Sequence, residues 1–152
     1  MDSKDREIIR ELQLNGRLTN QELSDRVNLS PSPCLRRLRA LEAEGVITGY
    51  TALVDQELFG LPLTVFIQVS LDKHDEKTVG RFEDYIRKID EILECWMTTG
   101  DADYLLRVVA SSIDDYEKFI RTRLHRIPGV GSIDTSFAYG RIKRSFVYPN
   151  KE

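Results

Sequence analysis

"LSPSPCLRRLRALEAEGVI", residues 29–47, combines two prolines, a leucine repeat and three arginines within a single short segment. Proline fits the first turn of a helix because its φ is already helical and the N–H that it lacks would have no partner there. The segment therefore predicts a helix that starts at Pro31 if Ser30 is the N-cap, or at Pro33 if Ser32 is the N-cap. The sequence leaves both alternatives open, and Gly45 ends the helix in either case.

The two sides of this predicted helix differ in chemistry. At about 100° per residue, one side carries the apolar stripe Cys34, Leu35, Leu38 and Leu41. The other side is small and basic, and residues 30–41 contain no acid although the whole chain has a net charge of -3. Arginine pairs with guanine in the major groove, and a helix N-terminus favours phosphate. We therefore predict DNA contacts by Ser30, Ser32, Pro33, Arg36, Arg37 and Arg39.

The residues before this helix predict two further helices. Apolar spacing indicates a helix over residues 2–14, and Asn15-Gly16 ends it. Thr19 and Glu22 have the spacing of a capping box, which predicts a second helix to about residue 27. Residues 46–54 predict a β segment after Gly45. The order predicts a winged helix-turn-helix domain over residues 1–54.

The second half of the chain has a different pattern, which begins after a hinge at residues 55–62. Alternating apolar residues predict strands over 63–71, 92–100, 104–110 and 130–148. Helical spacing predicts helices over 75–89 and 112–127. The order β-α-β-β-α-β predicts a ferredoxin-like domain over residues 63–152, with two helices on one face of an antiparallel sheet. The fold class is therefore α+β.

The other face of that sheet has no cover in a single copy of the chain. We expect residues such as Phe66, Trp96 and Phe137 to be exposed there. An uncovered apolar face predicts self-association. A dimer also suits the first domain, because two recognition helices related by a two-fold axis contact half-sites about 34 Å apart.

Composition and motifs exclude several other classes of protein. The chain has 152 residues, of which 41% are apolar and 31% charged, as expected of a globular protein. It has no apolar run long enough to cross a membrane, and its charged N-terminus is unlike a secretory signal. Cys34 and Cys95 lie far apart, which favours reduced thiols in a cytoplasm. Histidines and cysteines lack metal-ligand spacing, so we predict no metal, and no motif of a catalytic site is present.

Two segments resemble the Lrp/AsnC family of feast-or-famine transcription regulators: "LSPSPCLRRLRALEAEGVITGYTALV", residues 29–54, and "TGDADYLLRVV", residues 99–109. The likeness is greatest to the leucine-responsive branch. The resemblance implies an N-terminal DNA-binding domain and a C-terminal RAM-type domain that binds small molecules, usually amino acids. It also implies dimers that assemble further, often into octamers, and a prokaryotic protein of the cytoplasm that is associated with the nucleoid.

The segment from Gly100 to Tyr104 is a candidate effector site. A free amino acid needs acceptors for its ammonium and donors for its carboxylate, and this turn offers two acids and a glycine backbone. Ordinary turn chemistry is the alternative explanation for the same residues. The resemblance implies a pocket between subunits, lined by this turn and by a strand at residues 135–138. The predicted effector residues are Gly100, Asp101, Asp103, Tyr104, Thr135 and Ser136.

Together these patterns predict a sequence-specific regulator of transcription. We expect double-stranded DNA, an amino-acid effector and other copies of the chain as its partners, and no cofactor. Binding of the effector would change the oligomeric state or the DNA binding. The alternative is an architectural DNA-binding protein without a ligand, and an enzyme is disfavoured.

Overall fold

The computed structural model describes residues 1–149, which form two compact units. The first unit comprises Met1–Leu53 together with the C-terminal segment that begins at Ile142. The second unit comprises Val54–Arg141. This division differs from the domains expected from sequence in two respects: residues 54–62 group with the second unit, and the C-terminal segment groups with the N-terminal helices.

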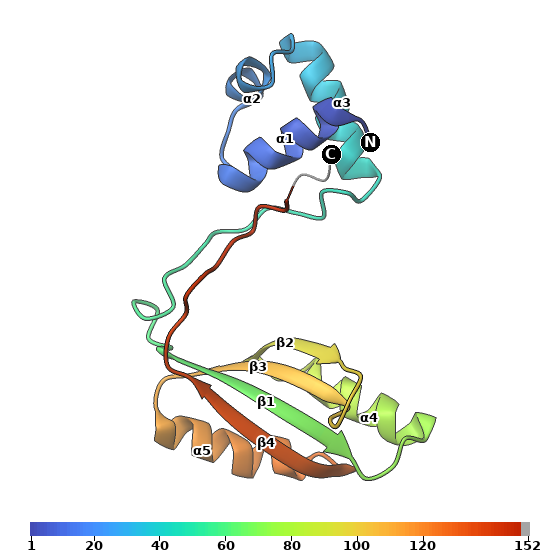
Figure 1. Cartoon of the computed structure of the whole chain (residues 1–152), viewed down its shortest axis with the longest axis vertical. Helices are drawn as coiled ribbons and strands as arrows, with labels where there is room; N and C mark the ends of the chain where they lie inside the picture. The colour runs from blue at the N-terminus through green and yellow to red at the C-terminus, as the bar shows by residue number, and fades with distance from the viewer. Residues whose placement is uncertain (150–152) are drawn as a thin grey trace. The chain divides into compact units, whose positions relative to one another are not determined.

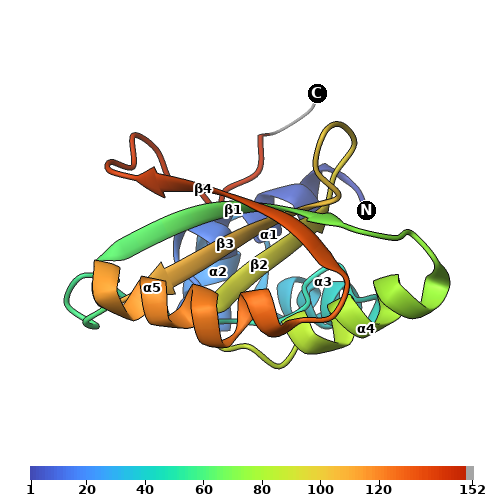
Figure 2. The same cartoon turned by 90° about the horizontal axis from the view of Figure 1, so that it is seen from below.

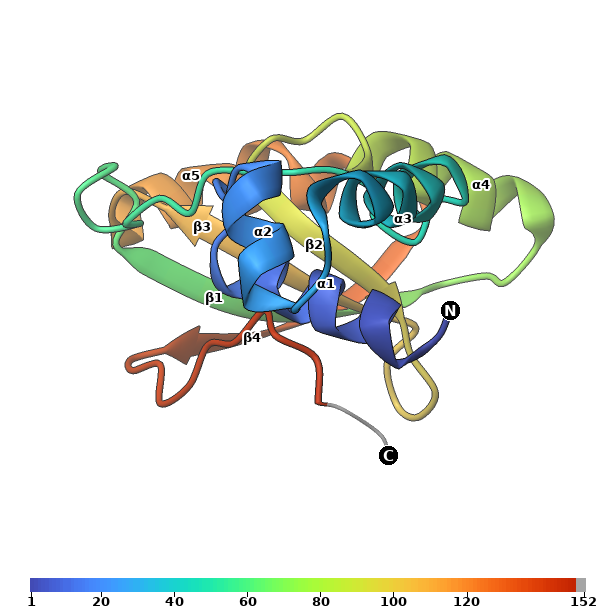
Figure 3. The same ribbon diagram turned by 90° about the horizontal axis from the view of Figure 1, so that it is seen from above.

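The first unit contains three helices: α1 (Ser3–Leu14), α2 (Asn20–Arg26) and α3 (Pro31–Ala43). Figure 3 shows α2 and α3 joined by a short turn. The capping box at the start of α2 is confirmed, because the Glu22 N–H donates to Thr19 Oγ1 at 3.2 Å and the Thr19 N–H donates to Glu22 Oε2 at 2.7 Å. The core of the unit consists of Ile8, Leu23, Val27, Cys34 and Leu41.

Helix α3 begins at Pro31, with Ser30 as the N-cap. The structure thereby selects the first of the two alternatives that the sequence left open. The Ser30 side chain makes no capping hydrogen bond. The first turn is closed by the backbone instead, with the Cys34 N–H donating to the Ser30 carbonyl at 3.1 Å. Cys34 and Leu41 are buried, which confirms that the predicted apolar stripe faces the core.

The strand predicted over residues 46–54 is wrong, since this segment has no regular secondary structure. The N–H groups of Val46 and Ile47 both donate to the Leu41 carbonyl, at 3.0 and 3.1 Å. These bonds close the C-terminal end of α3, where helical carbonyls lack partners. Gly45 makes this closure possible by adopting a φ of 71°. The apolar residues here follow the helix and do not pair as a strand.

The second unit is a four-stranded sheet with two helices on one face (Figures 1 and 2). In chain order the elements are β1 (Leu63–Leu71), α4 (Glu76–Ile86), β2 (Ile92–Met97), β3 (Tyr104–Ala110), α5 (Ile113–Thr122), a 3-10 turn η1 (Leu124–Arg126) and β4 (Val130–Ala138). The strands lie in the order β2-β3-β1-β4, and every neighbouring pair is antiparallel. The ferredoxin-like topology and the α+β class are confirmed.

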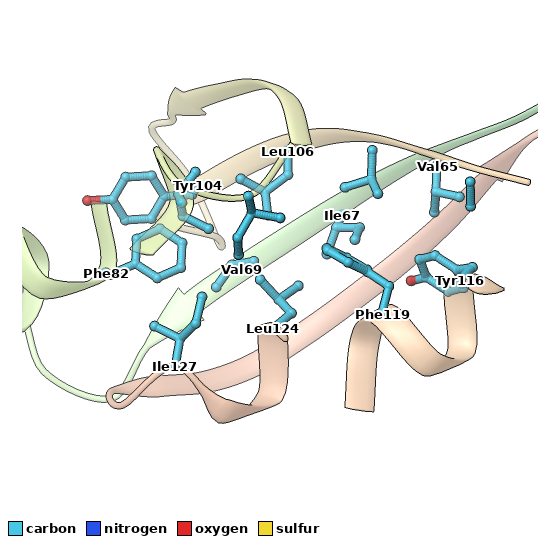
Figure 4. Close-up of a cluster of buried hydrophobic side chains, with 14 of the residues drawn as sticks. Val65, Ile67, Val69, Phe82, Tyr104, Leu106, Tyr116, Phe119, Leu124 and Ile127 are labelled. Carbon is cyan, nitrogen blue, oxygen red and sulfur yellow. The ribbon is translucent and has the colours of Figure 1, made fainter. Parts of the chain in front are cut away.

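The core of this unit lies between the sheet and the two helices (Figure 4). Alternate residues of β1, namely Val65, Ile67 and Val69, are fully buried against it. Phe82 of α4 and Phe119 of α5 cover them from the helical side. The predicted inward faces of both helices are therefore confirmed.

Strand β4 is shorter than predicted, ending at Ala138 and not near residue 148. Its pairing with β1 runs from Leu71 opposite Val130 to Thr64 opposite Ala138. Beyond Thr64 only Leu63 of β1 remains, so the sheet offers almost no further partner for β4. The alternation in residues 139–148 belongs to a segment that leaves the sheet.

The uncovered face of the sheet carries apolar side chains, as expected. Phe66 is 36% exposed and Trp96 is 48% exposed, and both strand positions alternate with residues that face the helices. Phe137 was expected on the same face, and this expectation is wrong. Phe137 lies opposite the buried Val65, and its ring packs edge-on against Tyr116 of α5, with ring centroids 5.0 Å apart. It therefore lies on the side covered by the helices.

Candidate nucleic-acid interface and effector site

The outer face of α3 presents most of the predicted DNA-contacting residues to solvent. Ser30, Ser32, Arg36 and Arg39 are exposed, and Pro33 is half-buried. Within residues 1–149, neither Arg36 nor Arg39 forms an ion pair with a side chain of the same chain. Two guanidinium groups thus stand on this face without an acidic partner in the described part of the molecule.

The start of α3 is held in place by Asn20, the first residue of α2. Its Nδ2 donates to the Pro31 carbonyl at 2.9 Å, which ties the first turns of the two helices together. The Asn20 Oδ1 is buried and has no hydrogen-bond partner in the described residues. An unpaired buried oxygen costs free energy, which offsets part of what the hydrogen bond to Pro31 contributes. The sequence indicated a turn between α2 and α3 but not this contact.

Arg37 points to the protein and not to solvent. Its Nη1 lies 2.7 Å from Asp2 Oδ2 and 2.8 Å from Asp5 Oδ1, at the start of α1. Its side chain is 32% exposed. We call this arrangement the Arg37 clamp, because it joins the middle of α3 to the N-terminus of α1. A phosphate contact by Arg37, as predicted from sequence, would require both ion pairs to break.

The Arg37 clamp rests on a capping box that the sequence analysis did not identify. The Asp5 N–H donates to Asp2 Oδ1 at 3.0 Å, and the Asp2 N–H donates to Asp5 Oδ2 at 2.7 Å. The Asp5 backbone N–H lowers the pKa of the Asp2 carboxyl below its ordinary value, and the Arg37 guanidinium lowers it further. Two acids three residues apart before an apolar pattern are the sequence feature that predicts such a box.

The remaining face suits an extended polyanion. The N-terminal turn of α3 offers the Ser32 N–H and the positive end of the helix dipole, since Pro31 and Pro33 have no N–H. Arg36 and Arg39 add two charges beside it. Arginine can pair bidentately with phosphate or with the O6 and N7 atoms of guanine. The geometry therefore supports a helix whose exposed side contacts nucleic acid and whose other side is anchored to the fold.

In the second unit, Asp103 lies in the turn that joins β2 to β3. Its Oδ2 accepts the Leu71 N–H at 2.7 Å, and its Oδ1 lies 2.8 Å from Nε2 of His74. The Leu71 N–H lowers the pKa of the Asp103 carboxyl, and the hydrogen bond with His74 lowers it further. Gly100, in the same turn, has a φ of 128°, which favours glycine. Asp103 thus closes the end of β1 in addition to any contact with a ligand.

Tyr104, which follows directly, is buried beneath α4 and does not reach solvent in a single copy. Its ring lies 4.6 Å from that of Phe82, and its hydroxyl donates to Glu83 Oε1 at 3.2 Å. Burial and the neighbouring Glu83 raise the pKa of Tyr104 to about 12. Asp101, in contrast, is exposed. The turn therefore presents Asp101 outward while Tyr104 belongs to the core.

Thr135 and Ser136 of β4 lie on opposite faces of the sheet. The Thr135 hydroxyl is 2.6 Å from the Tyr116 hydroxyl and faces α5. It borders a cavity of about 370 Å³ between α5 and β4, whose lining residues are Ile113, Tyr116, Glu117, Ile120, Arg121, His125, Thr135 and Phe137. Ser136 lies opposite Phe66, on the uncovered face.

The predicted effector residues therefore do not form one pocket within a single chain. Strand β1 separates β3 from β4. Apart from Tyr104, which belongs to the core, the residues lie at three places: the turn before β3, the cavity beside α5 and the open face of the sheet. The sequence analysis did not link His74 to Asp103, which it contacts in the structure. No three His, Cys, Asp or Glu side chains in residues 1–149 lie close enough to hold a metal ion, and none of the helices described could span a membrane.

Known protein families match both units. The model of the Lrp/AsnC ligand binding domain matches residues 64–148, and a winged helix-turn-helix DNA-binding model matches residues 1–48. The chain belongs to the Lrp/AsnC family. The resemblance inferred from the sequence is confirmed over both halves. This member of the Lrp/AsnC family is a transcriptional regulator with a DNA-binding helix-turn-helix and a ligand-binding domain.

Individual relatives of this Lrp/AsnC protein agree over most of the chain. The leucine-responsive regulatory proteins of Klebsiella pneumoniae and Escherichia coli K12 are each 40% identical over 145 residues, which is 95% of this chain and 88% of theirs. A transcriptional regulator from Neisseria meningitidis, solved as a complex with L-Met, is 41% identical with a TM-score of 0.94 and covers 98% of this chain and 96% of its own. An AsnC family regulator from Agrobacterium tumefaciens is 34% identical with a TM-score of 0.93, covering 98% and 97%.

Proposed function

We propose that this protein contacts specific DNA sequences through α3 and that an amino acid bound at the second unit modulates the contact. The observation that supports the DNA contact is that the three arginines of α3 have different surroundings. Arg37 anchors the helix to α1, whereas Arg36 and Arg39 are exposed. Ser30, Ser32 and Pro33 allow the start of the helix to approach a groove. In functional terms we assign DNA binding to residues 1–54, a hinge to 55–62 and effector binding with oligomerisation to 63–152.

The amino-acid effector is proposed from the chemistry of the turn and from one relative. The Neisseria meningitidis regulator is described as a complex with L-Met. In this chain, Asp101 offers an exposed carboxylate for an ammonium group, and backbone N–H groups near Gly100 suit a carboxylate. Thr135 or Ser136 of a second copy would complete the pocket, because a single chain keeps them apart from the turn. Their side chains point to opposite faces of β4, so one pocket takes only one of them. The two copies then bind the effector jointly.

Self-association is proposed from the uncovered face of the sheet. Phe66 and Trp96 lie there together with the ion pair of Arg107 and Glu94, whose atoms are 2.7 Å apart. A second copy is the partner that matches this face and places two α3 helices on one DNA. Dimers would assemble further, up to octamers. The protein acts without a catalytic site, metal or cofactor, and in the cytoplasm, in association with the nucleoid.

Regulation then follows from mass action. An effector that binds between subunits stabilises the oligomer or geometry in which its pocket is complete. The shift cannot exceed the difference in affinity of the effector for the two states. The number of α3 helices that contact DNA simultaneously changes with that shift.

A genome-wide selection of bound DNA fragments, with and without a pool of amino acids, tests both parts of this proposal. We expect an enriched sequence motif in both conditions and a change of occupancy with the pool. Calorimetry with each amino acid then identifies the effector. Enrichment without a motif, together with no heat from any amino acid, would instead support an architectural DNA-binding protein.

A further inference from the structure

The C-terminal segment is fastened to the helix that begins the chain. The Nε2 of Gln13, near the end of α1, donates to the Phe146 carbonyl at 2.7 Å. The Tyr148 N–H donates to Gln13 Oε1 at 3.2 Å. One side-chain amide thus binds a carbonyl and an N–H two residues apart, as a neighbouring strand would. Figure 1 shows this part of the chain reaching the end of α1.

Local contacts stiffen the same segment. The Arg144 guanidinium lies 4.6 Å from the centre of the Phe146 ring, within the range of a cation–π interaction. The Ser145 hydroxyl accepts the Val147 N–H at 3.2 Å. Val147, between the two backbone groups bound by Gln13, is half-buried while its neighbours are exposed. The segment therefore holds a defined conformation where it meets Gln13. We call Ile142–Tyr148 the C-terminal strap.

The strap continues directly from β4, which carries Thr135 and Ser136. Ala138 ends β4, and seven residues, 139–145, separate it from Phe146. Seven extended residues span at most about 25 Å. The length of this connection therefore limits the distance between the end of β4 and Gln13 as long as the contact with Gln13 persists. A displacement of β4 larger than the remaining slack must move α1 or break the contact with Gln13.

The chain consequently passes between the two units twice, once at Leu53–Val54 and once at Arg141–Ile142. A single flexible connection allows one unit to rotate freely against the other. The composition of such a linker determines only how far apart the two units can move. A second, fastened connection removes much of this freedom. The two units are therefore joined by two covalent connections and not by one.

We propose that the C-terminal strap carries the effector response from β4 to α1 and that Gln13 is the residue that fastens it. This inference rests on the proposed effector function. An amino acid that shifts β4 would change the tension on the strap and hence the orientations available to α3. Without the fastening at Gln13, the effector would still bind, but its effect on DNA binding would be lost.

Four forms of the full-length protein test the role of the strap: the native chain, Gln13→Ala, a chain that ends at Arg144, and the combination of both changes. For each form, the dissociation constant for an operator fragment is measured with and without the effector amino acid. The ratio of the two constants reports the coupling. Gln21→Ala is the matched control, because its Nε2 hydrogen-bonds Asp25 within α2 and does not touch the strap.

We expect the same ratio of dissociation constants for the native chain and Gln21→Ala. For the other three forms we expect a ratio within about twofold of one, which means no response to the effector. Gln13→Ala should have no further effect in the truncated chain, because its partner is already absent. Calorimetry should show unchanged effector binding in all forms. A native-like ratio in Gln13→Ala or in the truncated chain would overturn the role of the strap alone. A native chain that binds no amino acid would overturn the effector function and, with it, the proposed route.

Hydrogen exchange without any effector tests the fastening independently. The Tyr148 amide should exchange slowly in the native chain and faster in Gln13→Ala, because its acceptor is removed. Equal exchange in the two proteins would show that the strap is not fastened in solution and would overturn the inference even if amino acids regulate DNA binding.

Discussion

At the scale of single residues, three arginines on one helix have different surroundings. Arg36 and Arg39 are exposed, whereas Arg37 bonds Asp2 and Asp5. The sequence grouped Arg37 with the predicted DNA contacts and could not show its partner, because Asp2 lies 35 positions away. Contacts of this kind depend on how helices pack, and helical periodicity contains no information about them.

Substitution of Arg36 and Arg37 by alanine should separate their roles. Arg37→Ala should lower the free energy of unfolding by about 1 kcal/mol, since it removes a partly exposed pair of ion contacts.

Arg36→Ala should leave stability unchanged and weaken operator binding by about 1–3 kcal/mol if Arg36 contacts a base. If it contacts only phosphate, the loss should be equal on all sequences, with a salt slope smaller by about 1. Urea denaturation and DNA titrations at several salt concentrations measure these quantities, and an unchanged DNA affinity for Arg36→Ala would remove it from the interface.

Asp103 has a structural role whose contribution to stability depends on pH. Its pKa lies below the ordinary value of 3.8 in the folded chain, because the Leu71 N–H and His74 bond the ionised form. The carboxylate therefore stabilises the fold above about pH 4, and this contribution is lost as the pH falls through the lowered pKa. Asp103→Asn should be roughly 1 kcal/mol less stable than the native chain at pH 7, and the gap should narrow below about pH 4. Unfolding curves from pH 7 to pH 3 measure the difference in free energy of unfolding between the native chain and Asp103→Asn. A difference that does not change with pH would contradict the stabilising role of the ionised Asp103.

The effector response of Asp103 variants is a separate measurement. If Asp103 also binds the ammonium of the effector, Asp103→Asn should abolish the response to the amino acid while DNA binding without effector persists. The response is measured by operator titrations with and without the amino acid at pH 7. The unfolding curves confirm that the variant is folded at this pH. A variant that responds normally would place the effector pocket elsewhere.

At the scale of elements, the bounds of β1 and β3 and the start of α2 were predicted correctly, whereas the end of β4 and the strand at residues 46–54 were not. Thr19 and Glu22 form their capping box because the bond pattern is local. Strand β4 ends opposite the start of β1, and residues 46–54 form no strand because they have no strand beside them. Alternation of apolar residues indicates that a segment can pair, but the partner strand decides whether it does.

The two N-caps of the helix-turn-helix should differ in energy. Thr19→Ala removes a side-chain bond to the Glu22 N–H and should lower the free energy of unfolding by about 1 kcal/mol. Ser30→Ala removes no capping bond and should change stability by less than about 0.5 kcal/mol. Thermal unfolding of both variants provides the comparison. A large loss of stability in Ser30→Ala would mean that its hydroxyl caps α3 in solution.

At the scale of the whole molecule, the sequence predicted the order of elements and the ferredoxin-like sheet, because apolar periodicity is clear in each segment. Thr135 and Ser136, although adjacent in sequence, point to opposite sides of β4, and β1 separates them from the turn at Asp103. The division of the effector residues among three places was not predictable from spacing along the chain. It depends on which strands are neighbours in the sheet and on the contribution of a second copy.

The uncovered sheet face should control oligomerisation. Trp96→Asp places a charge on that face and should shift the protein to smaller species in sedimentation, because a dimer would have to bury the carboxylate. Tyr85→Asp is a matched control, because Tyr85 is 47% exposed, close to the 48% of Trp96, but lies on α4 on the other side of the sheet. The control should sediment as the native chain does. Equal sedimentation of Trp96→Asp and the native protein would exclude this face as the interface.

The Arg37 clamp also bears on how such proteins diverge after gene duplication. Because the inner side of α3 is secured to α1, the outer positions can be exchanged with little loss of folding free energy. If Ser32 and Arg36 contact DNA as proposed, duplicated copies can acquire new targets through changes at these positions, while Asp2, Asp5 and Arg37 keep the helix anchored.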